Sequence, residues 1–335
     1  MLTRSRALFT RFVILLGAGT FLYLLFKFDP ARVWGDLRGF GWGFLALLPF
    51  QICDHMLNAT GWRLAFPPES AGGARYWDLV RVRIAGDGVN YLTPSAQIGG
   101  EFVRPGMLRS ELPTDVKVTS VLVAKITQSV GQAFFILSGI GFLLHAHLFQ
   151  FEGRQATMGA IGVGGILFGL VVGTSLLVIE PPAWFQRRFP KAVEASAGVR
   201  GLLKSFLLTH PVRLLGSIFF FMLGYAWGAA DIWIICHFLG RNLSVETAFS
   251  IEFLSNLVDA LAFWVPAKIG TQEAGKAAIF LGFGLPAELG FTAGIIRHVR
   301  ELCWAGLGLS LYAAHQRRTS RQQTAAARTK AIREA

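Results

Sequence analysis

The chain has 335 residues, of which 53% are hydrophobic and 16% are charged, and its mean hydropathy is +0.48. Soluble domains carry about 25% charged residues, so this composition excludes an ordinary soluble fold and favours a membrane protein. The net charge is +12, but the 38 glycines and 29 phenylalanines argue against a nucleic-acid-binding protein. In a membrane protein, an excess of Lys and Arg usually marks the cytoplasmic loops.

The first apolar segment, residues 12–26, follows a basic stretch and predicts a transmembrane helix that starts in the cytoplasm. No small-residue cleavage site follows it, so we expect this helix to be uncleaved. Residues 29–41 form a short, charge-balanced connection on the far side. Residues 42–60 predict a second helix on which Gln51, Asp54, His55 and Asn58 share one face. A carboxylate is costly in hydrocarbon, so this face should meet another helix through hydrogen bonds or border a wet transport pathway.

Residues 61–117 are too basic to be one lipid-facing span, and the positive-inside rule places this region in the cytoplasm. Within it, residues 79–92 and 98–108 are two amphipathic arms hinged at Thr93 and Pro94. Arms of 14 and 11 residues reach only about half of a ~30 Å hydrocarbon core. We therefore predict a re-entrant helical hairpin, which survives at membrane depth only where it packs in protein or lines a cavity.

The middle of the chain predicts three more helices and a second basic loop. Residues 118–144 form a third helix with Lys125, Gln128, Ser129 and Gln132 on one face, and residues 157–179 form a fourth. Residues 180–213 form a basic cytoplasmic loop before a fifth helix at 214–239, which carries the lone acid Asp231.

Residues 244–285 predict a second hairpin, whose first arm contains Asp259. That arm is about 20 residues long, so the alternative is that it spans the membrane. Residues 289–312 predict the last helix, with Arg297, Arg300 and Glu301 near its middle. The tail from Gln316 has six Lys or Arg residues against one Glu, so we expect it to be cytoplasmic and disordered.

The two hairpins share an ordered set of residues, which indicates an internal duplication. In each, a proline is followed seven residues later by a glutamate and three residues after that by a cation: Pro94, Glu101 and Arg104 in the first, and Pro266, Glu273 and Lys276 in the second. A Leu-Pro pair, with a threonine six residues beyond its proline, follows both copies. Paired segments interrupted by Pro and Gly are typical of transporters with inverted repeats.

A basic carboxyl end and basic loops on the same side as the amino terminus require an even number of spans, so the hairpins enter from opposite faces. We therefore predict an all-α polytopic membrane protein with an inverted-topology repeat, about six transmembrane helices and two re-entrant helical hairpins. Its single transmembrane domain comprises residues 1–313, with halves at 1–147 and 157–313, and residues 314–335 are a basic cytoplasmic tail.

Each hairpin glutamate lies near the start of a short helix, and two explanations remain open. An acid there complements the helix dipole and pairs with the cation three residues on, which is a structural role. Alternatively, the helix amino ends bind an anion in a central cavity, nearby cations add counter-charge for a phosphate-bearing headgroup, and the glutamates carry or gate protons. The candidate transport residues are Asp54, Asn90, Pro94, Gly100, Glu101, Arg104, Lys125, Asp231, Asp259, Pro266, Gly270, Glu273, Lys276, Arg297, Arg300 and Glu301.

We expect no metal, cofactor or catalytic site. Cys53, Cys236 and Cys303 lie singly in apolar segments, without metal-ligand or disulfide spacing. The sequence has no GxSxG, HExxH or GxxxxGK[ST], so it indicates neither these hydrolase chemistries nor ATP-driven pumping by this chain.

The chain resembles the flippase-like transmembrane family through Asn90-x-x-x-Pro94 running into Gly99-Gly100-Glu101, through Pro266-x-x-x-Gly270-x-x-Glu273, and through Arg297 in the last helix. That family includes the membrane part of lysylphosphatidylglycerol synthetases and a branch associated with hopanoid biosynthesis. The resemblance covers roughly residues 10–313 and implies movement of lipids between leaflets of the bacterial inner membrane. The soluble aminoacyl-transfer domain of the synthetases is expected to be absent, because the chain ends about 22 residues past the last helix.

We therefore expect a lipid translocator rather than an enzyme, with an anionic or hopanoid membrane lipid as substrate. Its transport would be either passive or coupled to a gradient of protons or another ion. Two alternatives remain open: a membrane-embedded lipid-modifying enzyme, and a non-catalytic partner of lipid-biosynthesis enzymes. No nucleic-acid partner is expected. The location implied is the bacterial inner membrane, with several spans and both termini in the cytoplasm.

Overall fold

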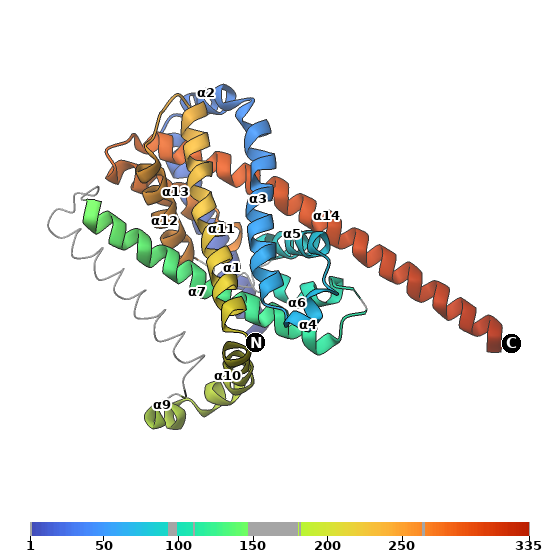
Figure 1. Cartoon of the computed structure of the whole chain (residues 1–335). Coiled ribbons are helices and arrows are strands. Elements are labelled where there is room, and N and C mark those ends of the chain that lie inside the picture. Colours follow the sequence, from blue (N-terminus) through green and yellow to red (C-terminus); the bar gives the residue numbers. More distant parts are fainter. Residues whose placement is uncertain are drawn as a thin grey trace.

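The computed structural model describes residues 2–92, 99–109, 111–146, 180, 182–262 and 265–334, and the regular structure within these ranges is entirely helical (Figure 1). The predicted all-α fold is therefore confirmed for this part of the chain. The helices are α1 (Leu2–Lys27), α2 (Pro30–Phe40), α3 (Gly43–Leu64), α4 (Pro68–Ala71), α5 (Tyr76–Leu92), α6 (Gly99–Met107), α7 (Thr114–Ala146), α9 (Ala183–Arg188), α10 (Pro190–Thr209), α11 (Pro211–Phe238), α12 (Val245–Leu261), the 3₁₀ helix η1 (Pro266–Lys268), α13 (Thr271–Gly282) and α14 (Ala287–Glu334).

Several helices have the length of membrane spans. Among the described residues, Thr114–Leu143 of α7 and Pro211–Phe238 of α11 are long and apolar enough to cross a bilayer, and Leu15–Lys27 of α1 is a shorter apolar segment. With 22 and 48 residues, α3 and α14 also exceed the roughly 20 residues that a bilayer core requires, but they carry polar and charged side chains. Such side chains must face other helices or water rather than lipid.

Both predicted hairpins contain a helix too short to span. The first hairpin consists of α5 and α6, and the second of α12 and α13. Because α6 has 9 residues and α13 has 12, at about 1.5 Å per residue neither crosses a ~30 Å core. The turn of the first hairpin, with Pro94, lies outside the described residues. In the second turn, Ala267, Lys268 and Gly270 have left-handed φ values of 51°, 55° and 77°.

The two halves of the chain are interleaved. In the packed bundle α3 lies along α11, and α5 lies along α14, where a Cβ at Gly308 would be 2.2 Å from the Ile84 carbonyl oxygen. Next to them, α7 contacts both α11 and α12, and α1 packs against α13. Beside α13, a Cβ at Gly270 would lie 2.2 Å from the Gly17 carbonyl oxygen. Close backbone contact, together with the positive φ of Gly270, therefore requires glycine at this position.

Two apolar clusters enclose a polar layer in the middle of the bundle. Along α3, Leu47 belongs to one cluster and Trp62 to the other; along α11, Ile235 and Phe221 divide in the same way. The polar face predicted for α3 lies between its two apolar positions. This arrangement places polar side chains at the depth where a membrane protein is least able to expose them to lipid.

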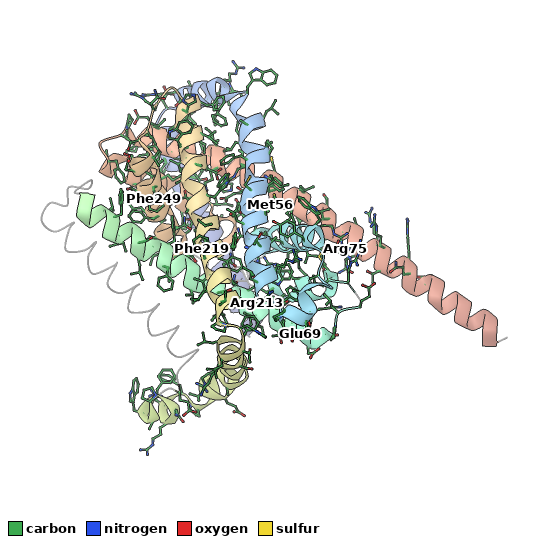
Figure 2. All side chains as sticks on the ribbon, in the orientation of Figure 1. Met56, Glu69, Arg75, Arg213, Phe219 and Phe249 are labelled. Atoms are coloured by element: carbon green, nitrogen blue, oxygen red, sulfur yellow. The ribbon has the colours of Figure 1, made fainter. Side chains whose placement is uncertain are left out.

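Arg213 lies at the end of the bundle where α4 and α10 lie. Figure 2 shows Glu69 and Arg213 at this end, and Figure 1 shows α2 at the opposite end. Arg213 donates from Nε to the Phe66 carbonyl oxygen at 3.0 Å and from Nη2 to the Arg63 carbonyl oxygen at 2.9 Å. These bonds satisfy carbonyl groups at the end of α3, which have no partner within the helix.

Three segments differ from the expectations. Residues 29–41, expected as a short connection, contain α2, because Asp29 accepts a hydrogen bond from the Ala31 N–H at 3.0 Å and because Val33 and Phe40 are buried. Residues 180–213, expected as a loop, contain α9 and α10. The expected disorder of the tail is wrong, since α14 continues through it; its Ala, Arg and Gln residues are strong helix formers. The predicted helix at 157–179 lies outside the described residues.

Candidate functional site

A polar cavity of about 200 Å³ lies between the two apolar clusters. Side chains from α3, α5, α7, α11, α12 and α14 line it, together with Lys268 from the turn of the second hairpin. Its charged lining residues are Asp54, Arg83, Asp231, Glu252, Asp259, Lys268, Arg297, Arg300 and Glu301. Buried charges are costly unless they are paired, so the pairing decides what this cavity can hold.

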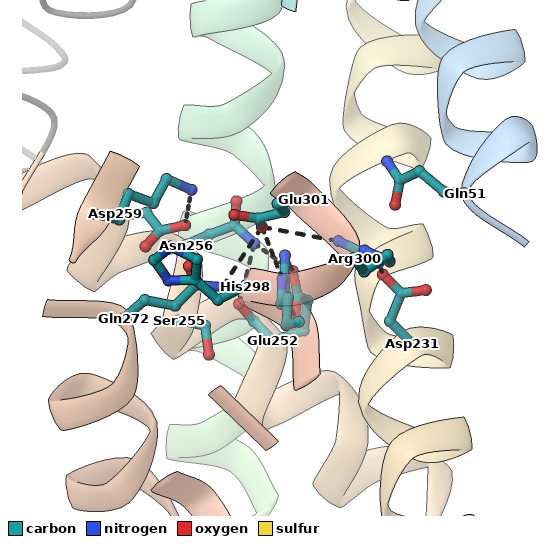
Figure 3. A network of polar contacts seen from close by, with 12 residues as sticks. Gln51, Asp231, Glu252, Ser255, Asn256, Asp259, Gln272, His298, Arg300 and Glu301 are labelled. Carbon is teal, nitrogen blue, oxygen red and sulfur yellow. Dashed lines mark hydrogen bonds and ion pairs between the residues drawn. The ribbon is translucent and has the colours of Figure 1, made fainter. Parts of the chain in front are cut away.

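Glu252 of α12 and Arg297 of α14 form an ion pair in the cavity through both carboxylate oxygens. Arg297 Nη2 lies 2.9 Å from Glu252 Oε1, and Asn256 donates from Nδ2 to the same oxygen at 2.9 Å. Arg297 Nε also lies 3.4 Å from Glu301 Oε1. Figure 3 shows Glu252, Asn256 and Glu301 converging from α12 and α14. Arg297 therefore pairs with two acids, and Glu252 is a closer partner than Glu301.

Two further ion pairs join neighbouring elements to this network. Arg300 forms an ion pair with Asp231 of α11, and its Nη2 lies 3.8 Å from Glu301 Oε1 (Figure 3). Lys268 Nζ lies 2.5 Å from Asp259 Oδ2, so the strained turn of the second hairpin is tied to α12. Together, these pairs connect α11, α12, α14 and the hairpin turn around one cavity.

The first hairpin has its own ion-pair network. Arg104 of α6 binds Asp87 of α5, with Nη2 2.6 Å from Oδ1, and it also binds Glu101. Arg83 Nε lies 3.1 Å from Asp87 Oδ2, and Lys125 Nζ of α7 lies 3.2 Å from Glu101 Oε1. The expected pairing of Glu101 with the cation three residues on is therefore confirmed. In addition, Glu101 ties α6 to α7.

Asn90 and Gly100 hold the two arms of the first hairpin together. The Gly100 N–H donates to Asn90 Oδ1 at 2.6 Å, which satisfies one of the free amides at the start of α6. A Cβ at Gly100 would lie 2.1 Å from the Gly86 carbonyl oxygen, so a side chain does not fit there. These contacts give both candidate residues a structural explanation.

The glutamate of the second hairpin has different partners. Glu273 Oε2 accepts from the Gly270 N–H at 2.9 Å, and Oε1 lies 2.7 Å from His298 Nδ1 of α14. Lys276 is 2% exposed, and no carboxylate of the described residues forms an ion pair with it. The predicted pairing of Glu273 with Lys276 is therefore wrong. The bond to Gly270 turns the Glu273 carboxylate back toward the start of α13, as in a capping box.

The predicted polar face of α3 borders the cavity. Asp54 Oδ2 accepts from Gln51 Nε2 at 2.8 Å, and Asp54 Oδ1 accepts from Asn58 Nδ2 at 2.9 Å. Asn58 Oδ1 in turn accepts from Arg83 Nη2 at 3.2 Å. This face therefore joins the cavity to the network of the first hairpin.

A family model described as the lysylphosphatidylglycerol synthase TM region matches residues 9–308. The chain belongs to this family. No curated protein and no solved structure matches the chain significantly. Family membership confirms the resemblance to the membrane part of lysylphosphatidylglycerol synthetases and places the protein in the membrane with a lipid-related function. The apolar lengths of α7 and α11 agree with this location.

In this member of the lysylphosphatidylglycerol synthase TM-region family, part of the predicted site comes together. The predicted residues that line the cavity are Asp54, Asp231, Asp259, Arg297, Arg300 and Glu301. Those outside its lining are Asn90, Gly100, Glu101, Arg104, Lys125, Gly270, Glu273 and Lys276. Of the remaining two, Pro266 opens η1 and Pro94 lies outside the described residues.

Six ionisable residues of these networks are not among the candidate transport residues: His55, Arg83, Asp87, Glu252, Lys268 and His298. Spacing within the repeat could have found two of them. In both copies an aspartate precedes the hairpin proline by seven residues, which makes Asp87 equivalent to Asp259. In both copies a basic residue also follows the proline of the Leu-Pro pair by twelve residues, which makes Lys125 equivalent to His298. In each half, this basic residue binds the hairpin glutamate.

Gly224 and Gly228 of α11 make room for the cavity side chains, and Gly228→Ala tests this role. A Cβ at Gly228 would lie 2.1 Å from Glu252 Oε1, and one at Gly224 would lie 2.9 Å from Asn58 Nδ2. We expect Gly228→Ala to lower the free energy of unfolding in detergent by about 1–3 kcal/mol, because the methyl group displaces the Glu252 carboxylate. Gly306→Ala is the matched control, since no atom lies within 4 Å of its new Cβ. Equal losses in both variants would contradict the prediction.

Proposed function

We propose that this protein is a lipid translocator, and not an enzyme, and that a lipid headgroup passes between the leaflets through the polar cavity. The observation that carries the proposal is an ion-paired cavity that lies between two apolar clusters in a protein of a lipid-related membrane family. A headgroup that crosses the bilayer needs polar partners at depth. Paired charges supply these partners without leaving a bare charge in hydrocarbon.

The proposed substrate is a lipid with an anionic, phosphate-bearing headgroup; a hopanoid is the alternative that the family resemblance implies. Arg83, Arg297 and Arg300 line the cavity, and a guanidinium presents paired N–H donors that match phosphate. The buried Nε of Arg300 has no acceptor among the described residues. A phosphate oxygen would provide that acceptor.

The proposed topology is an inverted repeat of about six spans with two re-entrant hairpins, in the bacterial inner membrane and with cytoplasmic termini. The equal spacing of aspartate, proline and glutamate in the two hairpins supports it, as does the pairing of α5 with α6 and of α12 with α13. Labelling of single cysteines in a cysteine-free variant tests it. We expect Arg75→Cys to react from the cytoplasm and Arg32→Cys, on α2, to react from the periplasm; the reverse pattern would refute this topology.

Reconstitution into liposomes tests the proposed function. The purified protein is reconstituted into liposomes that contain either phosphatidylglycerol or a hopanoid with a fluorescent reporter. An external reagent quenches the reporter only in the outer leaflet. We expect faster exchange between leaflets than in protein-free liposomes, and loss of this exchange in Arg300→Gln. The control is Arg318→Gln, an exposed position on the part of α14 beyond the predicted spans, which should exchange lipid like the unchanged protein.

Mass spectrometry of the same lipids separates translocation from catalysis. Unchanged lipid masses are expected. A chemically altered lipid would instead favour a lipid-modifying enzyme. A folded protein that neither moves nor alters any tested lipid would contradict the proposal and favour a role as a partner of lipid-biosynthesis enzymes.

A further inference from the structure

The charges that line the cavity are paired with one exception. Arg83 binds Asp87, Lys268 binds Asp259, Arg297 binds Glu252 and Glu301, and Arg300 binds Asp231. Asp54 is the carboxylate of the lining that no Lys, Arg or His of the described residues reaches at ion-pair distance. The cavity therefore holds one acid whose negative charge is not compensated by a direct partner.

Neutral amides hold this acid in place. Each carboxylate oxygen of Asp54 accepts one N–H, from Gln51 Nε2 at 2.8 Å and from Asn58 Nδ2 at 2.9 Å. The orientation of the Asn58 amide is fixed, because its Oδ1 accepts from Arg83 Nη2 at 3.2 Å. Asp54 is thus positioned on α3 without being neutralised there.

The groups around Asp54 come from every element packed against it. On α5 and α14 these are Arg83, Asp87, Arg297 and Arg300, and on α11 they are Tyr225 and Asp231. In the same cavity, α7 contributes the neutral Gln128 and α12 contributes the acid Glu252. Every arginine among them is bound to another carboxylate. An uncompensated carboxylate in a low-dielectric site is costly, and binding a proton removes that cost.

We propose that Asp54 is the proton-carrying residue of this protein and that lipid movement through the cavity is coupled to proton movement. The inference rests on the proposed function. Asp54 takes one proton from hydronium on one side of the membrane, forming one O–H bond and releasing water, and returns that proton to water on the other side. Glu101 and Glu273 do not serve this role, because Arg104, Lys125 and His298 already bind them.

A proton fits this site better than a metal cation. Both oxygens of Asp54 already face N–H donors, whereas a bound Na⁺ would require several converging oxygen atoms. The described residues also contain no cluster of His, Cys, Asp and Glu that would hold a metal ion. One acid with two amide donors is sufficient for a proton.

Liposomes with an imposed pH gradient test the coupling. We expect the unchanged protein to accumulate the reporter lipid in one leaflet under the gradient. As lipid moves, the pH inside the liposomes should change, and a pH-sensitive dye trapped inside them should report this change. Asp54→Asn should lose both responses, and Asp54→Glu should restore them in part. The control Glu111→Gln removes an exposed carboxylate and should leave both responses intact. Gradient-driven accumulation in Asp54→Asn, or accumulation driven by Na⁺ instead of protons, would overturn the inference.

Infrared spectroscopy of the protein in bilayers tests Asp54 without transport. The unchanged protein should show a pH-dependent carbonyl band of a protonated carboxylic acid that is lost in Asp54→Asn and shifted in Asp54→Glu. Persistence of the same band in Asp54→Asn would refute the assignment. If the unchanged protein moves no lipid at all, the proposed function fails, whereas the infrared result still decides whether Asp54 binds a proton.

Discussion

Replacing Arg297 by methionine is expected to lower the free energy of unfolding by about 3–5 kcal/mol, because it leaves the Glu252 carboxylate buried without its cation. Glu252 is 1% exposed, so water does not compensate its charge, and only Asn256 Nδ2 would still donate to it. Unfolding in detergent, together with the yield of monodisperse protein, measures the loss.

A double-mutant cycle is the control for this prediction. Glu252→Met alone should be destabilising for the converse reason, since Arg297 then keeps only Glu301 at 3.4 Å. The double variant Glu252→Met, Arg297→Met should recover most of the stability, because both charges are removed together, but it should not recover lipid movement. Losses that simply add in the double variant would show that the two charges are hydrated and that their pairing contributes little.

The two hairpin glutamates are expected to respond unequally to the same substitution. Glu101→Gln should cost about 2–3 kcal/mol, because the buried Arg104 loses one of its two carboxylate partners and Lys125 loses its ion pair with Glu101. Glu273→Gln should cost only about 1 kcal/mol, since a glutamine oxygen still accepts from the Gly270 N–H and His298 can be neutral. The free energy of unfolding of both variants measures the difference.

Lipid movement by the same two variants separates a structural role from a transport role. Each variant that folds is reconstituted at equal density and compared with the unchanged protein. Lost lipid movement in folded Glu273→Gln would support a transport role for the hairpin glutamates. Normal movement would leave them as residues that fix the helix starts. Equal destabilisation of Glu101→Gln and Glu273→Gln would contradict the difference in partners that the structure shows.

Local periodicity was sufficient to predict several of the long helices and part of the polar faces that they present. Residues at i, i+3 and i+7 lie on one side of a helix, so Gln51, Asp54 and Asn58 could be placed together from sequence, and they do bind one another. The same reasoning placed Lys125 and Gln128 on one face of α7; Lys125 binds Glu101, and Gln128 lines the cavity. The short helices α6 and α13 could also be predicted locally, because Pro and Gly interrupt the chain just before each of them.

Partner choice could not be predicted in this way, because it depends on which helices become neighbours. Glu273 and Lys276 have the spacing of an ion pair. Glu273 instead binds His298 of α14, which lies 25 residues further along the chain. Glu252 could not be selected from the sequence, because its partner Arg297 lies 45 residues further along the chain, on α14. The helix α2 was missed because its amphipathic face is short and its charges are balanced, which also describes a connecting loop.

The interleaved packing has a consequence for how the protein is made. During synthesis α1 emerges first, but Gly17 reaches its backbone neighbour Gly270 only after about 250 further residues have been translated. In the same way, α5 can pack against Gly308 only after α14 has been translated. Contacts between such distant segments form late and slowly. The amino-terminal half therefore cannot complete its packing until the carboxyl-terminal half has been made.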